Sequence, residues 1–581
     1  MTRVSRTAGS EWTTAEQILA LLAQHGVEFL FLNPGTDTAP FQEAMTSLPA
    51  RGVRIPRVVP CSHEAVALAA AHGYWKVTGR PQCVVVHVDV GTQNLGAMVH
   101  DAFRDRAGVV LIAGKAPYGE DPDVPGGRSN PIHWHQDVPD QAGIVRGYAK
   151  WSMEITRPDV VARCVGRAVQ IATAPVAGPT YLTVSRDVLM EPAVVREDEA
   201  AGYAVPAPPP VGTDELRRIS GLVAGAERPL VLTARVGRQP RAVAALARLA
   251  DLVGLRVGGR PEALNIPWSH PLHLRSPEAT QRAVAEADVI LVVECDVPWI
   301  PRRVRPAADA RVVHIDPDPV KADMPLWSFP AELAVMADGA TALEQLVGAL
   351  AAMSAEDPEL AVRWSTRREA VLGAAGSNGN RQKAAVTEAR GMAMPTPAAA
   401  VAALSELLSP EDIVLEEAVT NAAVVHEHLE RSTPGTFLEA GGPGLGWALG
   451  GAVGVKLARP GRVVAAIVGD GSFQFGVPTA ALALAAEADT PFLTVILDNE
   501  GYRASRLPVL ELFPDGAAAA AGSVAGTRFA RPPHFAGVAE ACHAYGEQVT
   551  TTAELSGAFK RGLAAVAEGR SAVIDVVVGG Q

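Results

Sequence analysis

The sequence predicts an α/β fold with three domains, each a doubly wound parallel β-sheet covered by helices on both faces. The chain has 581 residues, which corresponds to three domains of about 100–200 residues each. Short apolar runs of strand length alternate with stretches of helical spacing, the pattern of sheets whose strands all run parallel. Hydrophobic residues make up 48% and charged residues 20%, which indicates a packed globular protein.

The first domain is expected over residues 1–190. Residues 15–25 have the apolar spacing of a helix, and residues 28–32 form a short apolar run of strand type. Two further apolar runs, 83–88 and 109–113, are predicted as buried strands. A proline-rich segment at 204–210 then predicts a stiff, extended linker.

The second domain is expected over residues 205–350, with one helix and three strands predicted at 241–252, 229–232, 289–293 and 311–315. Residues 352–394 are rich in alanine, charge, glycine and serine, and we expect a helix followed by an irregular connector. The third domain is expected over residues 395–581, with strands predicted at 413–415, 462–468, 491–497 and 571–578. The first and third domains alternate alike, which hints at a duplicated fold.

Composition limits the partners and the compartment. The formal net charge of −12 argues against nucleic acid and anionic membranes. Five scattered cysteines without a Cys-x-x-Cys pair favour a reducing compartment. Residues 1–10 lack the apolar core of a signal peptide, and no stretch of about 20 apolar residues predicts a membrane span. We therefore expect a cytoplasmic protein.

Two polar turns at neighbouring strand ends are the most informative feature. The first, Gly-Asp-Gly at 469–471, follows an apolar run, and the second, Asp-Asn-Glu-Gly at 498–501, follows the next. Asp470, Asn499 and the carbonyl of Gly501 offer hard oxygen ligands that suit Mg²⁺ or Ca²⁺. The glycines let the main chain approach a phosphate. A lone Gly-Asp-Gly is also common in turns that bind nothing.

A second constellation lies near the N-terminus. Glu64 precedes an alanine-rich helix, and His87 ends an apolar strand before the turn Gly-Thr-Gln-Asn at 91–94. Each residue has an ordinary explanation: Glu64 as a carboxylate interacting with a helix dipole, and His87 as a core histidine. His133 and His135 favour a polar loop, because a zinc site needs further ligands.

Taken in order, these motifs and the Gly-Gly-Pro-Gly-Leu-Gly-Trp stretch at 441–447 resemble the thiamine-diphosphate enzymes. That family includes acetolactate synthase, benzoylformate decarboxylase and pyruvate decarboxylase. The resemblance covers almost the whole chain. It implies a pyrimidine-binding domain, a middle domain and a diphosphate-binding domain, in that order, with thiamine diphosphate and Mg²⁺ as cofactors.

The resemblance also implies roles for particular residues. Asp470, Asn499 and Gly501 correspond to metal ligands. Glu64 corresponds to the carboxylate that bonds the aminopyrimidine ring, and Leu445 to the apolar prop that bends the cofactor. The other implied cofactor contacts are Asn94, Thr420, Asn421, Gly444, Gly469, Gly471, Ser472 and Tyr502.

Near the substrate, the resemblance implies catalytic roles for His87 and Gln136 beside Glu64. Thr36 matches a substrate-contacting serine, and Trp299 lies in the stretch that replaces a second active-site histidine. After the strand at 229–232 the middle domain lacks a glycine-rich turn, so FAD is not expected.

The implied activity is that of an acetolactate synthase-like carboligase. It would decarboxylate a 2-oxo acid and transfer the acyl unit, as a carbanion equivalent, to a carbonyl acceptor. A benzoylformate decarboxylase-like 2-oxo acid decarboxylase or an acyloin lyase is the alternative. A non-catalytic cofactor-binding relative is disfavoured because Glu64 and the metal set are present. In relatives the active site forms between subunits, which implies a homodimer or a dimer of dimers.

Overall fold

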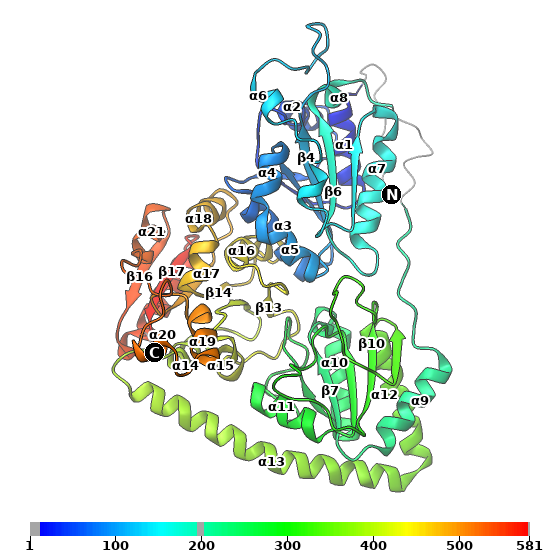
Figure 1. The fold of residues 1–581 in the computed structure, drawn as a ribbon, viewed down its shortest axis with the longest axis vertical. Helices are drawn as coiled ribbons and strands as arrows, with labels where there is room; N and C mark the ends of the chain where they lie inside the picture. Colours follow the sequence, from blue (N-terminus) through cyan, green and yellow to red (C-terminus); the bar gives the residue numbers. More distant parts are fainter. Residues whose placement is uncertain (1–11, 195–202, 579–581) are drawn as a thin grey trace.

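The computed structural model describes residues 12–194 and 203–578, with side chains 374–383 left out. The segment 1–10, where no signal peptide is expected, lies outside these residues. Three parallel β-sheets build the molecule, one in each of three domains (Figure 1). The expected fold class is therefore confirmed. No helix in the described residues is both long and apolar enough to cross a membrane.

The N-terminal domain is a six-stranded parallel sheet with strand order β2-β1-β3-β4-β6-β5. Its strands are β1 Phe29–Leu32, β2 Arg57–Pro60, β3 Gln82–Val86, β4 Val109–Lys115, β5 Trp151–Ile155 and β6 Thr180–Ser185. Its helices are α1 Thr14–Gln24, α2 Ala39–Ala50, α3 Glu64–Thr78, α4 Val88–Asn94, α5 Gly96–Arg104, α6 Ile132–His135, α7 Val161–Thr173 and α8 Arg186–Met190. The strand β3 is buried at every position, which explains its uninterrupted run of apolar residues.

The C-terminal domain repeats that topology, with strand order β13-β12-β14-β15-β17-β16. Its strands are β12 Ile413–Glu417, β13 Phe437–Glu439, β14 Val464–Gly469, β15 Leu493–Asp498, β16 Tyr545–Val549 and β17 Ala572–Val577. Its helices are α14 Pro397–Ser405, α15 Ala422–His428, α16 Trp447–Ala458, α17 Asp470–Phe475, α18 Pro478–Glu487, α19 Arg503–Leu512, α20 Ala517–Ala520, α21 Phe535–Ala541 and α22 Leu555–Ala567. Counted from the first strand, both sheets read 2-1-3-4-6-5, so the suspected duplication exists in the topology.

The middle domain has a five-stranded parallel sheet with order β11-β10-β9-β7-β8. Its strands are β7 Pro229–Thr233, β8 Arg256–Gly258, β9 Val289–Val293, β10 Arg311–Asp316 and β11 Leu333–Met336, and its helices are α9 Thr213–Gly225, α10 Pro240–Val253, α11 Pro277–Glu286, α12 Gly339–Glu356 and α13 Pro358–Gly391. Residues 204–210, expected as a linker, carry no regular structure.

Two expectations from the sequence are wrong. The connector expected before residue 394 is instead the helix α13, which crosses from the middle to the C-terminal domain (Figure 1). Asp357 caps this helix and Pro358 occupies its first turn, which starts a helix in spite of the later glycines. The run at 83–88 ends as a strand at Val86, because His87 already caps α4.

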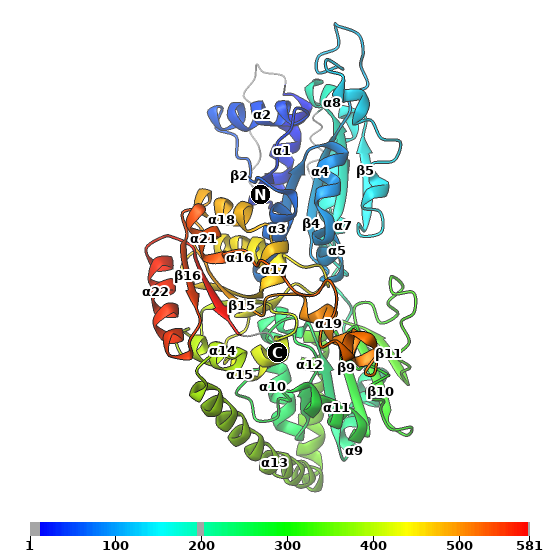
Figure 2. The same cartoon turned by 60° about the vertical axis from the view of Figure 1, so that its left-hand side comes forward.

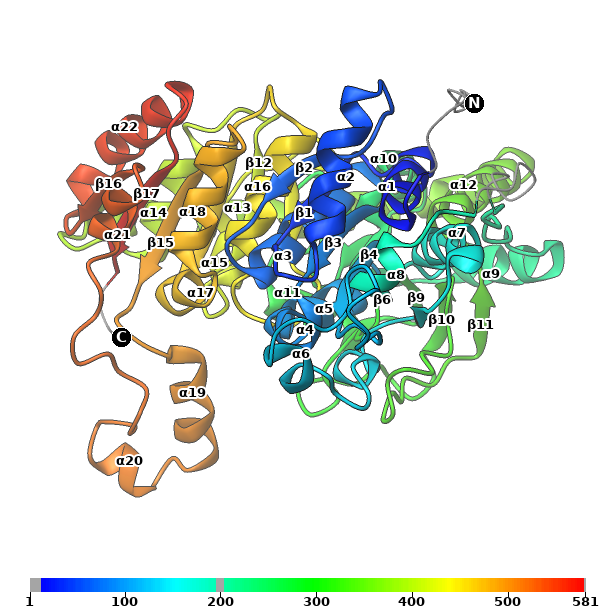
Figure 3. The same ribbon diagram turned by 90° about the horizontal axis from the view of Figure 1, so that it is seen from above.

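The first and last domains are joined by helices α3 and α16, which occupy equivalent places in the two repeats and pack against each other (Figures 1 and 2). Glycines permit their close approach: a Cβ at Gly73 would collide with the backbone of Gly451, and one at Gly454 with the carbonyl oxygen of Ala70. The helix α19, by contrast, projects away from the body of the chain and buries none of its residues (Figure 3).

Candidate active site

Two turns at the carboxyl ends of β14 and β15 meet as the sequence predicts. The strands are parallel neighbours. The amide of Gly501 donates a 2.7 Å hydrogen bond to Oδ2 of Asp470. Asn499 is half-buried in the same turn, beside Asp498. The structure thus brings the three expected metal ligands onto two adjoining turns.

Asp498 adds a carboxylate that the sequence analysis did not single out. Burial, followed by the charge of Asp498, raises the pKa of Asp470 to about 7, and burial also raises the pKa of Asp498. Within the described residues no basic side chain forms an ion pair with either carboxylate. These two adjacent carboxyl groups, which bond backbone amides and each other, form a hard-oxygen set that a divalent cation would satisfy. The residues present therefore fit a metal ion.

The first turn also has room for a phosphate. A Cβ at Gly469 would meet no atom within 4 Å, so the space beside this residue is open. The ring of Tyr502 lies over Gly471, where an added Cβ would be 3.3 Å from Cε1. The hydroxyl of Ser472 donates to the carbonyl oxygen of Glu417 at 2.9 Å, which ties α17 to the end of β12.

Two further loops border this site. Asn421, which is buried, and Thr420, which is half-buried, lie at the start of α15. In the second loop the amide of Gly444 donates to Oδ1 of Asp101 at 2.8 Å, so the N-terminal domain holds the loop that carries Leu445. Leu445 itself is half-buried. Thr420, Asn421, Gly444 and Leu445 therefore all lie in loops of the C-terminal domain.

Glu64 begins α3 and is 7% exposed. Its Oε2 accepts a 3.2 Å hydrogen bond from Nδ2 of Asn94 at the end of α4. A Cβ at Gly91 would lie 3.1 Å from Glu64 Oε1, so the Gly-Thr-Gln-Asn turn packs directly on the carboxylate. The structure therefore places Glu64 and Asn94 in direct contact.

His87 has partners on both ring nitrogens. Nδ1 forms a short hydrogen bond with Oδ1 of Asp37, and Nε2 lies 2.8 Å from Nε2 of Gln136. The hydrogen bond to Asp37 is the main reason that the pKa of His87 is raised, against the opposing effect of burial. The sequence analysis identified His87 and Gln136 but missed Asp37. Its place in the turn after β1, one residue beyond Thr36, was the available signal.

The backbone directly after His87 adopts a strained conformation. Val88, the residue after it, has φ = 32°, a rare conformation for a β-branched residue. Gly35 leaves the space that the imidazole of His87 fills, because a Cβ there would collide with Nδ1. The sharp turn ends β3 at Val86 and points the chain into α4.

Two expected substrate residues lie in different surroundings. Thr36 is exposed in the loop that carries Asp37. Trp299 is 8% exposed and belongs to a hydrophobic cluster of the middle domain, where it contacts Phe329 edge-on with ring centroids 5.3 Å apart. Trp299 therefore packs in the core of the middle domain. Within the described residues it takes no part in the hydrogen bonds of His87.

A second cluster of possible metal ligands lies at the ends of β12 and β13. Ligand atoms of Glu416, His426 and Glu439 lie within 4.8 Å of one another. However, His426 Nε2 already bonds Glu439 at 2.9 Å, and Arg260 Nε lies 3.4 Å from the same carboxylate. Burial and the neighbouring Glu439 raise the pKa of Glu416, which favours a neutral acid at this position. The cluster is satisfied by its own hydrogen bonds and ion pairs.

At the carboxyl edge of the middle sheet, buried ion pairs occupy the place where open α/β sheets bind nucleotides. Lys321 Nζ lies 2.8 Å from Asp296 and 2.6 Å from Asp316. Arg235 contacts Asp296, and Arg106 of the N-terminal domain reaches Asp316 at 3.0 Å. These contacts, rather than a glycine-rich turn, fill the crevice.

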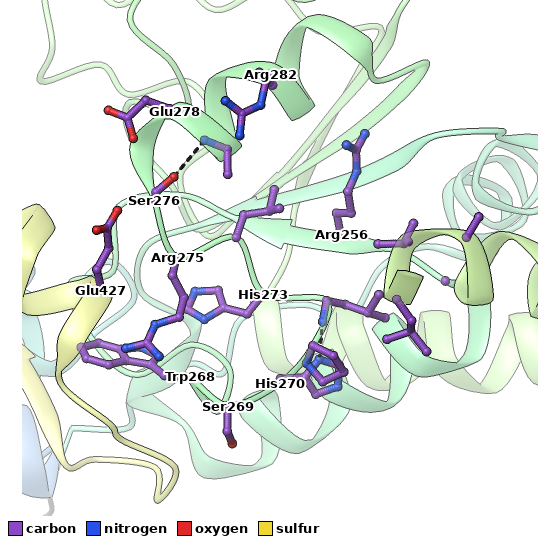
Figure 4. A pocket seen from close by; sticks show the side chains of 18 of the residues that line it. Arg256, Trp268, Ser269, His270, His273, Arg275, Ser276, Glu278, Arg282 and Glu427 are labelled. Carbon is purple, nitrogen blue, oxygen red and sulfur yellow. Dashed lines mark hydrogen bonds between the residues drawn. The ribbon is translucent and has the colours of Figure 1, made fainter. Parts of the chain in front are cut away.

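A large groove lies at the opposite edge of that sheet and is lined in part by residues of α13, and Figure 4 shows side chains that line it. Arg256 at the start of β8, together with Arg275 and Arg282, lines it. Because Arg256 begins a strand, the groove is at the amino edge, and none of the expected site residues line it.

The expected residues thus form two groups. The first group lies in the N-terminal domain and consists of Glu64, Asn94, His87 and Gln136. The second lies in the C-terminal domain and consists of the turns that carry Asp470 and Asn499. The contact between α3 and α16 links the two domains, yet within the described residues no hydrogen bond joins one group to the other.

Family models match each of the three domains. The N-terminal TPP-binding domain of thiamine pyrophosphate enzymes matches residues 12–144, the central domain residues 216–346 and the C-terminal TPP-binding domain residues 418–576.

Several curated relatives span most of the chain. Benzoylformate decarboxylase of Pseudomonas aeruginosa is 28% identical over 94% of this chain and 95% of its own. The probable acetolactate synthase large subunit of Methanocaldococcus jannaschii is 25% identical over 84% of this chain and 80% of its own. Among solved structures, the thiamine diphosphate-dependent 4-hydroxybenzoylformate decarboxylase of Rhodococcus jostii shares the fold, with a TM-score of 0.79 at 23% identity, covering 98% of this chain and 100% of its own.

Proposed function

Because the chain belongs to the thiamine pyrophosphate enzyme family, we propose that it uses thiamine diphosphate and Mg²⁺ to decarboxylate a small 2-oxo acid. When bound, the cofactor supplies a nucleophilic carbon and an electron sink for the bond to the leaving carboxylate. The protein's residues bind it, orient it and handle protons. Asp470, Asn499 and the carbonyl of Gly501 would hold the metal against the diphosphate.

Glu64 would hold the proton shared with the cofactor's aminopyrimidine ring. Its carboxylate is nearly buried and its Oε2 is oriented by Asn94. Burial of this kind keeps water away from the shared proton. Leu445, on the loop held by Asp101, would support the cofactor's bent shape.

Decarboxylation and carboligation differ in what happens to the acyl unit after CO₂ has left. The observation that carries our first choice is the bonding of His87 to Asp37, since it places a protonatable nitrogen with a raised pKa in the N-terminal site. A positioned proton donor favours release of an aldehyde, so we place 2-oxo acid decarboxylation first. This reverses the preference drawn from the sequence.

Carboligation is the second candidate. Gln136 occupies the Nε2 side of His87 and would limit proton delivery, which favours transfer of the acyl unit to a carbonyl acceptor. The exposed loop of Thr36 would then contribute to the acceptor pocket once a second subunit is present. We propose a cytoplasmic location and a homodimer or a dimer of dimers, since in the described residues no hydrogen bond links the two residue groups within one chain.

A substrate screen tests this function. Purified protein with thiamine diphosphate and Mg²⁺ is incubated with aliphatic and aromatic 2-oxo acids, with and without carbonyl acceptors. Release of CO₂ with an equal amount of aldehyde supports the decarboxylase. Acyloin or acetolactate formation supports the carboligase, and absence of CO₂ from every 2-oxo acid contradicts both.

A further inference from the structure

The carboxylate that bonds His87 is buried and also contacts the backbone beyond it. Asp37 is 5% exposed and lies in the turn between β1 and α2. Its Oδ1 bonds His87 Nδ1, and its Oδ2 accepts a 3.2 Å hydrogen bond from the amide of Val88. One carboxylate thus holds both the side chain of His87 and the strained residue that follows it.

The surrounding backbone is shaped for this carboxylate. Gly114, in strand β4, lies directly beneath Asp37, and a Cβ there would collide with Oδ2. Gly35 makes the equivalent space for the imidazole. Two separate segments therefore lack a side chain where the Asp37–His87 pair lies.

The bond to Asp37 decides which nitrogen of His87 can react. A carboxylate accepts only, so Nδ1 must carry a hydrogen. The nitrogen left for substrate is Nε2, which faces Gln136 at 2.8 Å. An amide can serve either state of this nitrogen, since its NH₂ donates to neutral imidazole and its oxygen accepts from imidazolium.

We infer that Asp37 is a positioning residue of the active site, which locks the Nδ1–H form of His87 and so makes Nε2 the atom that exchanges a proton with the substrate's carbonyl oxygen. In this step Nε2 of the imidazolium loses its proton, the oxygen gains it, and Nδ1 keeps the hydrogen bonded to Asp37. The inference rests on the proposed function, because it needs a 2-oxo acid substrate in the site.

Other charged groups face His87 and must be separated from Asp37 in a test. Asp89 of α4 and Glu64 of α3 raise the pKa of His87 through space, and His133 of α6 lies within range of its charge. Asp89 is as buried as Asp37 but forms no hydrogen bond to the imidazole. The substitution Asp89→Asn is therefore a matched control for loss of charge without loss of orientation.

The test combines spectroscopy with kinetics on the full-length protein carrying thiamine diphosphate and Mg²⁺. Nitrogen NMR of histidine-labelled protein, with the His87 signal assigned by its loss in His87→Gln, reports the tautomer without any substrate. We expect Asp37→Asn to lose the fixed Nδ1–H form and to lower kcat roughly 100-fold to 10,000-fold, the range of a lost proton transfer. We expect cofactor affinity and KM to change little.

Asp89→Asn should keep the tautomer. A wild-type tautomer in Asp37→Asn, or a kcat within about threefold of the wild type, would overturn the inference. If Asp37→Asn fails to fold, Gly114→Ala displaces the carboxylate without removing it, and a retained Nδ1–H signal there would count against the inference equally. Failure of the wild type to consume any 2-oxo acid would instead reject the proposed function, while leaving the tautomer measurement valid.

Discussion

The amide of Gly501 donates a 2.7 Å hydrogen bond to Oδ2 of Asp470, across 31 residues of sequence. This contact joins the turn after β14 to the turn after β15. Because parallel neighbours end at the same edge of a sheet, the crossover through helices α17 and α18 is enough to bring the two turns together. The metal site proposed above depends on this relationship.

The Asp470→Ala substitution should abolish Mg²⁺-dependent binding of thiamine diphosphate. The variant removes the carboxylate that would contact the metal and the acceptor that orders the Gly501 turn. Calorimetric titration of the metal-free protein with cofactor and Mg²⁺ measures the effect. Glu487→Ala, at an exposed carboxylate of α18 in the same domain, is the control and should bind normally. Wild-type affinity in Asp470→Ala would exclude Asp470 as a metal ligand.

Glu64→Ala should bind the cofactor yet lose most exchange of its thiazolium C2 proton. Glu64 is proposed to share a proton with the aminopyrimidine ring, which assists that exchange rather than the binding of the diphosphate. Hydrogen–deuterium exchange at C2, followed by NMR after acid quench, should slow by roughly 100-fold or more. Glu43→Ala, at an exposed site of α2, should exchange at the wild-type rate. Unchanged exchange in Glu64→Ala would show that another group activates the cofactor.

Gly454→Ala should destabilise the contact between the first and last domains. A Cβ at this position would collide with the carbonyl oxygen of Ala70, so α3 and α16 would have to separate. Overpacking of this kind costs about 1–3 kcal/mol and should lower the thermal unfolding midpoint. Gly348→Ala in α12 is the matched control, because no atom lies within 4 Å of its Cβ. That change should instead stabilise the helix by about 0.5–1 kcal/mol. Equal midpoints for the two variants would contradict the observed helix contact.

Raising the pH should destabilise the fold through the buried carboxyl of Asp101, which accepts a hydrogen bond from the amide of Gly444. Burial raises the pKa of Asp101 to about 8, from an ordinary value of 3.8. Between these pH values the native carboxyl holds a proton that the unfolded chain has released, so its stabilising contribution is full below pH 3.8 and is lost by pH 8. Asp101→Asn should therefore gain stability relative to the wild type as the pH rises.

We expect that gain to be at least about 1.4 kcal/mol, the equivalent of one pKa unit. Thermal unfolding at several pH values measures it. Glu120→Gln, at an exposed carboxylate, should follow the wild type at every pH. A constant difference between Asp101→Asn and the wild type would show that Asp101 does not titrate in this range.

The sequence by itself determined the class of the fold and the pairing of the two polar turns that carry Asp470 and Gly501. The strands β7, β9 and β14 lie in the predicted places because buried parallel strands are continuous apolar runs, a local signal. Asp470 and Gly501 could be paired because parallel strands share an edge. The duplicated strand order was only hinted at, since it resides in topology and not in residue identity.

Only the tertiary structure decided the partners of the candidate site residues. Asp37 reaches His87 across 50 residues, and nothing in the turn Asn-Pro-Gly-Thr-Asp marks it as that partner. Trp299 looked like a pocket residue in the sequence, yet it packs in the middle-domain core against Phe329. Periodicity records which face of an element is buried, whereas the contact between two side chains depends on how the elements are placed in space, and that placement is set by the packing of the whole chain.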